Sequence, residues 1–460
     1  MKSTTHLHLY LTIIFIGILG SCKKNSDITS PPPPIDSSAE AKKARDTALL
    51  LSRDYYLWYN QIPPSFDPQS YADPAAVMIA LRNYSVEPVF NKAVDNWSFG
   101  VLKSDWNQLS GGFGSVNNIS STGDFGFKLV FRVEGDLRVG LVERLSPAGL
   151  AGVQRSWRVT KVNGNSNITT GNIPFLNNAL NSSSSTFTFA RPDGTSVEIP
   201  LTASTYSQET VYLDTIYNIG PKTIGYMVLN SFLGDTGKIY NDFARVMNNF
   251  ASENVSDIVI DLRYNGGGYV SVQEKLADYL APNSANGKVM MRETYNDKHQ
   301  NNNATLYFNK TGPLNPNHLL IIVTQSTASA SELLINNLKP YMDVKIVGPN
   351  NTDGKPVGFF PLSAGDWYVF PVSFRSTNSV NYGGYFDGFT PDAQVADGVD
   401  KGWGDPAEAS LAKAIRYITT GSFNKLAAPE IYKEDPVVTA GNQLLDKPSF
   451  KGSVDTRGMK

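Results

Sequence analysis

The sequence predicts a multidomain α/β protein, and three observations support this fold class. The chain has 460 residues, which is too many for a single hydrophobic core. From about residue 206 onward, apolar strands alternate with amphipathic helices, as in an α/β domain. Between about 112 and 204, short alternating strands are separated by turns rich in glycine, asparagine and serine, which is typical of a separate β-rich domain.

Residues 1–21 are typical of a signal peptide. The apolar run Leu9–Leu19 is too short to span a bilayer. The run Leu19–Cys22 resembles a bacterial lipobox, so Cys22, the one cysteine of the chain, is expected to carry a lipid. We therefore expect a lipoprotein of the bacterial cell envelope, attached to the outer membrane on its periplasmic or surface side. The alternative is a cysteine that follows an ordinary signal peptide.

The next segment, 22–38, contains four consecutive prolines and is expected to form an extended tether. A small helical region at 39–108 follows, because apolar residues recur at helical spacing in its first part. These residues are Ala44, Ala48, Leu51, Tyr55 and Trp58.

The same patterns give the other boundaries. We expect a β-rich domain at 112–204, an α/β core at 206–422 and a polar, loosely packed tail at 423–460. In the core, strands are expected at Thr223–Leu229, Ser256–Leu262 and Leu319–Val323, and helices near 236–250, 270–281 and 330–339.

The composition excludes several classes of function. A net charge of -2 offers no basic field for nucleic acid. One cysteine and four histidines argue against a structural zinc site and against a cysteine protease. No metal and no organic cofactor is expected.

The run Ser329–Glu332 is the most informative part of the sequence. It follows the apolar strand His318–Val323, and the leucines after it give the next segment a helical apolar face. Ser329 is therefore placed at a strand-to-helix junction, where free N–H groups and the helix dipole stabilise negative charge. This placement favours a serine nucleophile. The alternative is a capping box, in which Ser329 and Glu332 cap the helix without any catalytic part.

A base for such a serine is available in Lys355, which lies in the run Asp353–Pro356. A lysine acts as a base at neutral pH only where burial lowers its pKa. The alternative is a solvated loop lysine.

A second element, Ile258–Gly268, is a buried strand that ends in three glycines. Glycines there let the backbone bend sharply and approach a ligand closely. The alternatives are a plain tight turn or a phosphate-binding loop. The phosphate loop is disfavoured because no Gly-Lys pair in the chain is followed by serine or threonine.

The order of these motifs resembles the C-terminal processing, or tail-specific, serine proteases. The motifs are Asp261–Gly268, Ser329–Glu332 and Gly354–Lys355, in that order. The resemblance implies that Ser329 is the nucleophile and Lys355 the general base. It also implies an oxyanion hole made by the backbone N–H groups of Ala330 and of Gly266 or Gly267, and a core of the crotonase and Clp-protease type. Glu332 is expected to be either a helix cap or a residue that contacts the catalytic residues without reacting itself.

The resemblance extends over roughly residues 40–420. Ser146–Val153 and Val159–Gly164 look like the middle of the PDZ domain that these enzymes carry, and Gly402–Pro406 resembles the end of their protease core. The family therefore implies a PDZ-like domain at 112–204.

The loop around Phe125, Gly126 and Phe127 resembles the loop with which PDZ domains hold a chain terminus. Backbone N–H groups there would capture a terminal carboxylate while the peptide adds as a strand to the sheet edge. The alternative is a glycine-rich turn without a ligand.

One departure from the family pattern concerns Lys355. Many members carry a glutamine shortly after the lysine, where this chain has Val357–Phe360. Phe359 and Phe360 could compensate by excluding water from the ammonium group, which favours the neutral amine.

The sequence thus predicts an envelope serine endopeptidase that takes unstructured protein C-termini and cleaves them with a Ser-Lys dyad. Two alternatives stay open. One is a catalytically silent relative that binds peptide or lipid. The other is a Ser-His hydrolase of esters or cell-wall material that uses His299 or His318, the two histidines outside the predicted signal peptide.

Overall fold

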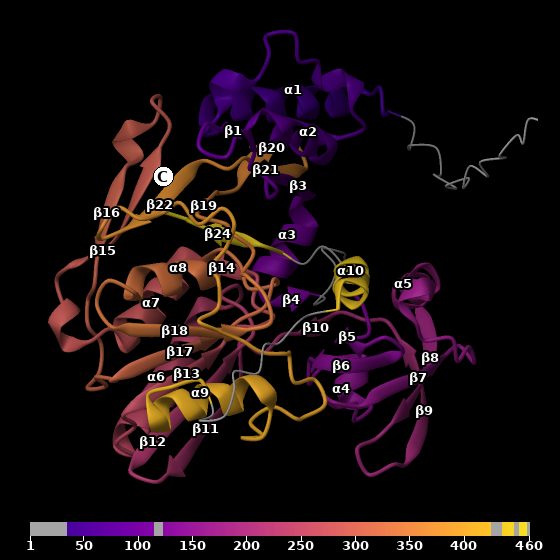
Figure 1. The fold of residues 1–460 in the computed structure, drawn as a ribbon. Helices are drawn as coiled ribbons and strands as arrows, with labels where there is room; N and C mark the ends of the chain where they lie inside the picture. Colours follow the sequence, from indigo (N-terminus) through magenta and orange to yellow (C-terminus); the bar gives the residue numbers. More distant parts are fainter. Residues whose placement is uncertain (1–34, 115–122, 425–434, 446–449, 458–460) are drawn as a thin grey trace, which may run out of the picture.

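A computed structural model describes residues 35–114, 123–424, 435–445 and 450–457 (Figure 1). The predicted signal peptide, Cys22 and most of the predicted tether lie outside the described residues. Within the described ranges, no helix is both long enough and apolar enough to cross a membrane.

The core domain is built on a six-stranded sheet with the strand order β11-β12-β13-β17-β18-β23. All neighbouring strands are parallel except β11 and β12. The strands are β11 (Val211–Ile219), β12 (Lys222–Leu229), β13 (Asp257–Asp261), β17 (His318–Ile322), β18 (Asp343–Gly348) and β23 (Ala393–Gln394). The helices packed on it are α6 (Thr236–Ser252), α7 (Val270–Leu280), α8 (Ala330–Leu338) and α9 (Ala409–Thr420).

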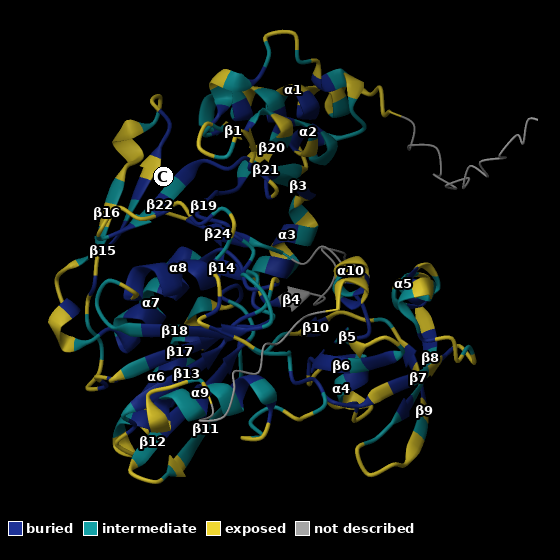
Figure 2. Ribbon diagram, viewed as in Figure 1, coloured by how far each residue is buried: buried dark blue, intermediate teal, exposed yellow. Residues whose placement is uncertain are grey.

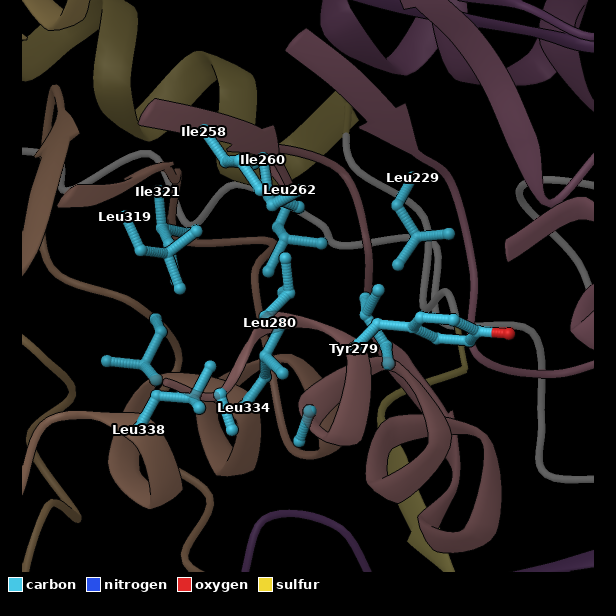
Figure 3. Close-up of a cluster of buried hydrophobic side chains, with 14 of the residues drawn as sticks. Leu229, Ile258, Ile260, Leu262, Tyr279, Leu280, Leu319, Ile321, Leu334 and Leu338 are labelled. Carbon is cyan, nitrogen blue, oxygen red and sulfur yellow. The ribbon is translucent and has the colours of Figure 1, made fainter. Parts of the chain in front are cut away.

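The central strands β13 and β17 are buried on both faces, as Figure 2 shows for them and for α8. Ile260 and Ile321 point toward Leu334 of α8 and its neighbours on one face (Figure 3). On the other face, Leu320 packs with Leu411 of α9. Continuous apolar runs are what a parallel sheet covered by helices on both sides requires. The predicted α/β fold class is confirmed, and the predicted core elements agree with the observed ones within a few residues.

The β-rich domain is a five-stranded antiparallel sheet with the order β5-β6-β7-β8-β9. Its elements are β5 (Phe127–Val133), β6 (Asp136–Val142), α4 (Pro147–Leu150), β7 (Arg158–Val162), α5 (Ile173–Leu180), β8 (Ser184–Ala190) and β9 (Ser196–Thr202). A cluster of phenylalanines that includes Phe127, Phe187 and Phe189 forms its core. The short strands β4 (Phe113–Gly114) and β10 (Tyr206–Ser207) pair where the chain enters and leaves this domain.

The helical region contains α1 (Ala39–Tyr55), α2 (Pro74–Leu81), β3 (Phe99–Leu102) and α3 (Lys103–Ser110). Residues from much later in the chain complete the packing of this region. Strand β3 pairs with β21 (Trp367–Phe370), which in turn pairs with β20 (Leu362–Ala364). A further antiparallel sheet, β16-β15-β22-β19, lies beside it and consists of β15 (Val289–Tyr295), β16 (Ala304–Tyr307), β19 (Val357–Gly358) and β22 (Phe374–Asn378).

The end of the chain differs from the loosely packed tail that the sequence predicts. Residues of this segment form helix α10 (Pro436–Leu445), which packs on the β-rich domain, and strand β24 (Gly452–Val454), which pairs with β14 (Gly267–Tyr269). The tail is polar on average, but Val438, Leu445 and Val454 are buried, and these few apolar contacts fix it to the rest of the molecule.

An ion cluster holds the chain where it leaves β13. Arg263 pairs with Asp261 at 2.7 Å, with Asp397 at 2.7 Å and with Glu408 at 3.0 Å. Glu408 also caps α9 by accepting a hydrogen bond from the N–H of Leu411. The guanidinium group is buried, so its charge is balanced only by these carboxylates.

We predict that Arg263→Ala lowers the free energy of unfolding by about 3–5 kcal/mol, because it leaves buried carboxylates without a counterion. Arg245 is the matched control, because its side chain is 55% exposed in its pair with Asp214. Arg245→Ala should cost less than about 1 kcal/mol. Urea denaturation of both variants is the measurement, and equal losses would contradict the prediction.

Candidate active site

The site lies where β13 and β17 end. The two strands are parallel neighbours, so the turns that follow them meet at the same edge of the sheet. A Cβ atom placed on Gly267 would lie 3.0 Å from the backbone N of Ala330, so only glycine lets these two turns approach so closely. The sheet topology therefore brings together the two predicted motifs, which are far apart in sequence.

Ser329 occupies a strained backbone conformation directly before α8. It has φ 59° and ψ -111° and its side chain is buried. Such a conformation costs a residue other than glycine about 1–3 kcal/mol, so the surrounding structure must hold it in place. The carbonyl of Asn265 does part of this by accepting hydrogen bonds from the N–H of Ala328 and the hydroxyl of Ser331. The hydroxyl of Ser329 itself is hydrogen bonded to Ser453 at 2.7 Å.

The carboxylate of Glu332 joins the serine turn to the lysine loop. One oxygen accepts hydrogen bonds from the N–H of Ser329 at 2.8 Å and of Lys355 at 2.9 Å. The other accepts from the N–H of Gly354 at 2.7 Å and from the hydroxyl of Thr352 at 2.5 Å. Burial raises the pKa of Glu332 to about 7, and these four donors favour its ionised form.

Lys355 is fully buried, and its amine lies 3.6 Å from the centre of the Phe359 ring and 5.7 Å from that of Trp97. Burial lowers the pKa of Lys355 well below its usual range, although the carboxylate of Asp95 opposes this shift. A neutral amine is the form that accepts a proton. Nζ donates a hydrogen bond to the carbonyl oxygen of Lys451 at 3.0 Å.

Of the two phenylalanines expected to keep Lys355 dry, only Phe359 contacts it. Phe360 packs instead beside Tyr55 and Tyr295, in a cluster on the other side of the strand. Successive side chains of an extended segment point in opposite directions, so the two rings cannot serve the same group.

The structure reduces the number of candidate oxyanion donors. The N–H of Gly267 is hydrogen bonded to the side chain of Asn265 at 2.9 Å and is not available to a substrate. Among the predicted donors, this leaves the N–H groups of Gly266 and Ala330, the latter in the first turn of α8. Negative charge is stabilised at such a helix N-terminus.

Sequence reasoning missed four residues that shape the site: Asn265, Thr352, Trp97 and Ser453. Asn265 lies inside the motif Asp261–Gly268. Its position between a strand and three glycines could have indicated a side chain that stabilises the turn. The other three come from distant segments, and no local pattern singles them out.

The two histidines of the alternative Ser-His hypothesis have contacts with residues other than Ser329. His318 opens β17, at the opposite end of the strand from the serine turn, and is bonded to Asp257. His299 is stacked on Tyr55, with ring centres 4.1 Å apart. Each makes a structural contact of its own.

The predicted peptide-binding residues have mainly structural contacts. The rings of Phe125 and Phe127 are buried in the core of the β-rich domain against Phe187. The N–H of Gly126 donates a hydrogen bond to the carboxylate of Asp124. These side chains shape the turn before β5 and present no surface to a peptide.

Comparison with known proteins agrees with this geometry. Residues 223–395 match the model of peptidase family S41. The chain is 30% identical over 152 residues to the carboxy-terminal processing protease CtpB of Bacillus subtilis (strain 168), and the match covers 33% of this chain and 28% of that protein. It thus spans little more than a quarter of the length of that relative.

One solved structure is similar in fold, and a second gives a weaker match. A protein of Bacteroides fragilis NCTC 9343 described as an S41 protease has a TM-score of 0.64 at 22% identity, over 82% of this chain and 97% of that one. A photosystem II D1 C-terminal processing protease has a TM-score of 0.47 at 18% identity, over 78% of this chain and 94% of that one.

The class of protein to which this chain shows similarity is that of the peptidases. Residues 223–395, which include Ser329 and Lys355, are similar to peptidase family S41.

We predict that Glu332→Gln both destabilises the protein and lowers peptidase activity. The amide NH₂ would face backbone N–H donors, which costs about 1–3 kcal/mol for each donor left without an acceptor. The serine turn and lysine loop would also lose their common link, so kcat should fall by roughly tenfold or more.

Urea denaturation and the rate of digestion of an unfolded protein are the measurements. Glu198→Gln, at an exposed position in β9, is the control and should change neither quantity. Full activity of Glu332→Gln would show that the carboxylate does not position the site.

Proposed function

We propose that this protein is a serine endopeptidase in which Ser329 is the nucleophile and Lys355 the general base. The observation that carries the proposal is the fixed relation of the two: one buried carboxylate, Glu332, binds the backbone N–H of both. The lowered pKa of Lys355 and the helix N-terminus beside Ser329 support the same roles.

In the proposed reaction, neutral Lys355 takes the proton of the Ser329 hydroxyl as Oγ bonds to the carbonyl carbon of the scissile peptide. The N–H groups of Ala330 and Gly266 stabilise the oxyanion. The C–N bond then breaks, and the Lys355 ammonium returns its proton to the leaving amine. Water attacks the resulting ester, gives a proton to Lys355 and releases the new carboxylate while Ser329 regains its hydrogen.

Substrates of this enzyme are unstructured protein C-termini, held by the β-rich domain acting as a PDZ-like module. Strand β5 is one of the two edge strands of that domain, and edge strands accept an added peptide strand. A cavity of about 220 Å³ lies along β5 and reaches toward the loop that precedes Ser329, with Ser326 in its lining. A peptide docked there would be close to the serine turn.

The enzyme acts in the bacterial cell envelope, attached to a membrane through a lipid on Cys22. The lipobox-like run at 19–22 and the proline-rich segment after it support this location. Labelling of cells with a palmitate analogue tests the lipid attachment. If the wild-type protein takes up no label, the assignment of Cys22 is contradicted.

We predict that purified protein digests an unfolded protein and that Ser329→Ala and Lys355→Ala each lower the rate by several powers of ten. His299→Ala and His318→Ala should leave the rate unchanged and serve as controls. All variants are first compared by circular dichroism. Loss of activity in a histidine variant with an active Lys355→Ala would favour the Ser-His alternative. Absence of cleavage by any form would favour the silent peptide-binding relative.

We predict that the rate of cleavage rises with pH in a range well below the usual pKa of lysine. Only neutral Lys355 acts as a base, so activity rises as pH increases through its lowered pKa. Phe359→Ser would admit water beside the amine and should move this rise to higher pH. Phe360→Ser is the matched control, because Phe360 is equally buried but packs elsewhere. Identical profiles for both variants would contradict the assignment.

A further inference from the structure

Two pieces of the same segment occupy the two places where the proposed function needs a substrate. Helix α10 lies on the edge of the β-rich domain, and strand β24 lies in the active site (Figure 1). We refer to the described residues 435–445 and 450–457 as the strap. The inference below rests on the proposed function.

The α10 part of the strap covers the free edge of β5. The side chain of Asn442 accepts a hydrogen bond from the N–H of Phe131 at 2.7 Å and donates one to its carbonyl at 3.0 Å. These backbone groups are the ones that an added peptide strand would use. Val438 and Leu445 are buried against the core of the domain, so α10 fills the groove with apolar surface as well.

The β24 part of the strap is hydrogen bonded on both sides within the active site. It runs parallel to β14, and the N–H of Gly452 donates to the carbonyl of Gly266 at 3.0 Å. On the other side, the N–H of Phe359 donates to the carbonyl of Ser453 at 3.0 Å. This is the way an extended peptide is held by a protein that recognises its backbone.

The strap also lies between the reacting groups. The hydroxyl of Ser453 is bonded to that of Ser329, and the carbonyl of Lys451 takes the hydrogen bond of the Lys355 amine. Within the described residues, Ser329 and Lys355 share no hydrogen bond. The nucleophile and its base are therefore both engaged by the strap and not by each other.

The position of Gly452 indicates that the strap resembles a bound substrate. A Cβ placed on Gly267 would lie 2.4 Å from the carbonyl oxygen of Gly452 and 3.0 Å from the N of Ala330. The carbonyl oxygen of Gly452 and the N of Ala330, one of the proposed oxyanion donors, therefore both lie close to the same point next to Gly267. A protein substrate could not use this position while the strap is present.

Ion pairs fix both ends of the β24 part. Lys451 pairs with Asp353 at 2.5 Å, in the loop that carries Lys355. Arg457 pairs with Glu274 at 3.0 Å and with the buried Glu293 at 3.1 Å. These contacts are reversible, since the side chain of Arg457 is 41% exposed.

We propose that the strap is a built-in inhibitor: residues 435–445 fill the peptide groove, residues 450–457 fill the active site of the same chain, and both must leave before a protein substrate binds. The strap then sets the resting activity, because the enzyme works only in the fraction of molecules from which it has dissociated.

The test compares full-length protein with a chain that ends at Asn424 and with Gly452→Trp. A Cβ at Gly452 would lie 2.3 Å from the Phe450 ring and 2.8 Å from the Phe359 ring, so a bulky side chain displaces β24 while the rest of the chain remains. Val437→Ala is the control, because Val437 lies on α10 with 59% of its surface exposed. Two readouts are used: digestion of an unfolded protein, and covalent modification of Ser329 by a fluorophosphonate.

Both the shortened chain and Gly452→Trp should react about tenfold or more faster than full-length protein in both readouts, and Val437→Ala should not differ from it. A synthetic peptide of residues 435–457 should slow the shortened chain again. If the shortened chain does not fold, Gly452→Trp alone decides the outcome.

Equal rates for full-length protein and folded Gly452→Trp, with Ser329→Ala inactive, would overturn the strap and leave the proposed function intact. A serine that stays unmodified in every folded variant would overturn both.

Discussion

The structure of the site depends on one buried carboxylate. Glu332 accepts four hydrogen bonds, and they come from both segments that carry the proposed reacting groups. Burying a carboxylate costs free energy unless hydrogen-bond donors satisfy its oxygens. If the loop that contains Lys355 moved away, Glu332 would lose donors and the folded state would be destabilised. The same bonds hold Ser329 in its strained backbone conformation. A residue that first looks like a helix cap thus connects the proposed nucleophile with its proposed base.

The sheet beneath supplies the second constraint. Because β13 and β17 are parallel neighbours, the glycine turn after one and the serine turn after the other are brought to the same edge. The Arg263 cluster reinforces this arrangement by tying the end of β13 to Asp397 and to the first turn of α9. Apolar packing holds the helices on the sheet, and these polar contacts fix the turns that form the candidate active site.

The strap adds a contact that opposes turnover. A helix on the β5 edge and a strand beside β14 bury backbone groups that a substrate would otherwise bind. A peptide within the same chain binds at high effective concentration, so modest contacts suffice to keep both places filled. An external substrate competes by offering the same backbone hydrogen bonds at two places at once. In this proposal, the strap competes with the substrate and so controls access to the site.

Much of the fold could be predicted from local patterns. Strand β13 (Asp257–Asp261) and the apolar face of α8 are each formed by neighbouring residues of the chain, so their type and limits follow from periodicity. The strap could not be predicted in this way. It is short and polar, and its order comes from a few buried residues such as Val438 and Val454, whose partners are far away in the chain.

The sequence by itself determined the α/β class, the order of the serine, lysine and glycine motifs, and Glu332 as a residue beside the serine. The tertiary structure alone decided which glycine N–H remains free, which phenylalanine dries Lys355 and what lies against Ser329. The reason is physical: secondary structure follows from neighbours along the chain, whereas hydrogen bonds such as the one between Ser329 and Ser453 or the one from Lys355 to Lys451 depend on how distant segments approach one another.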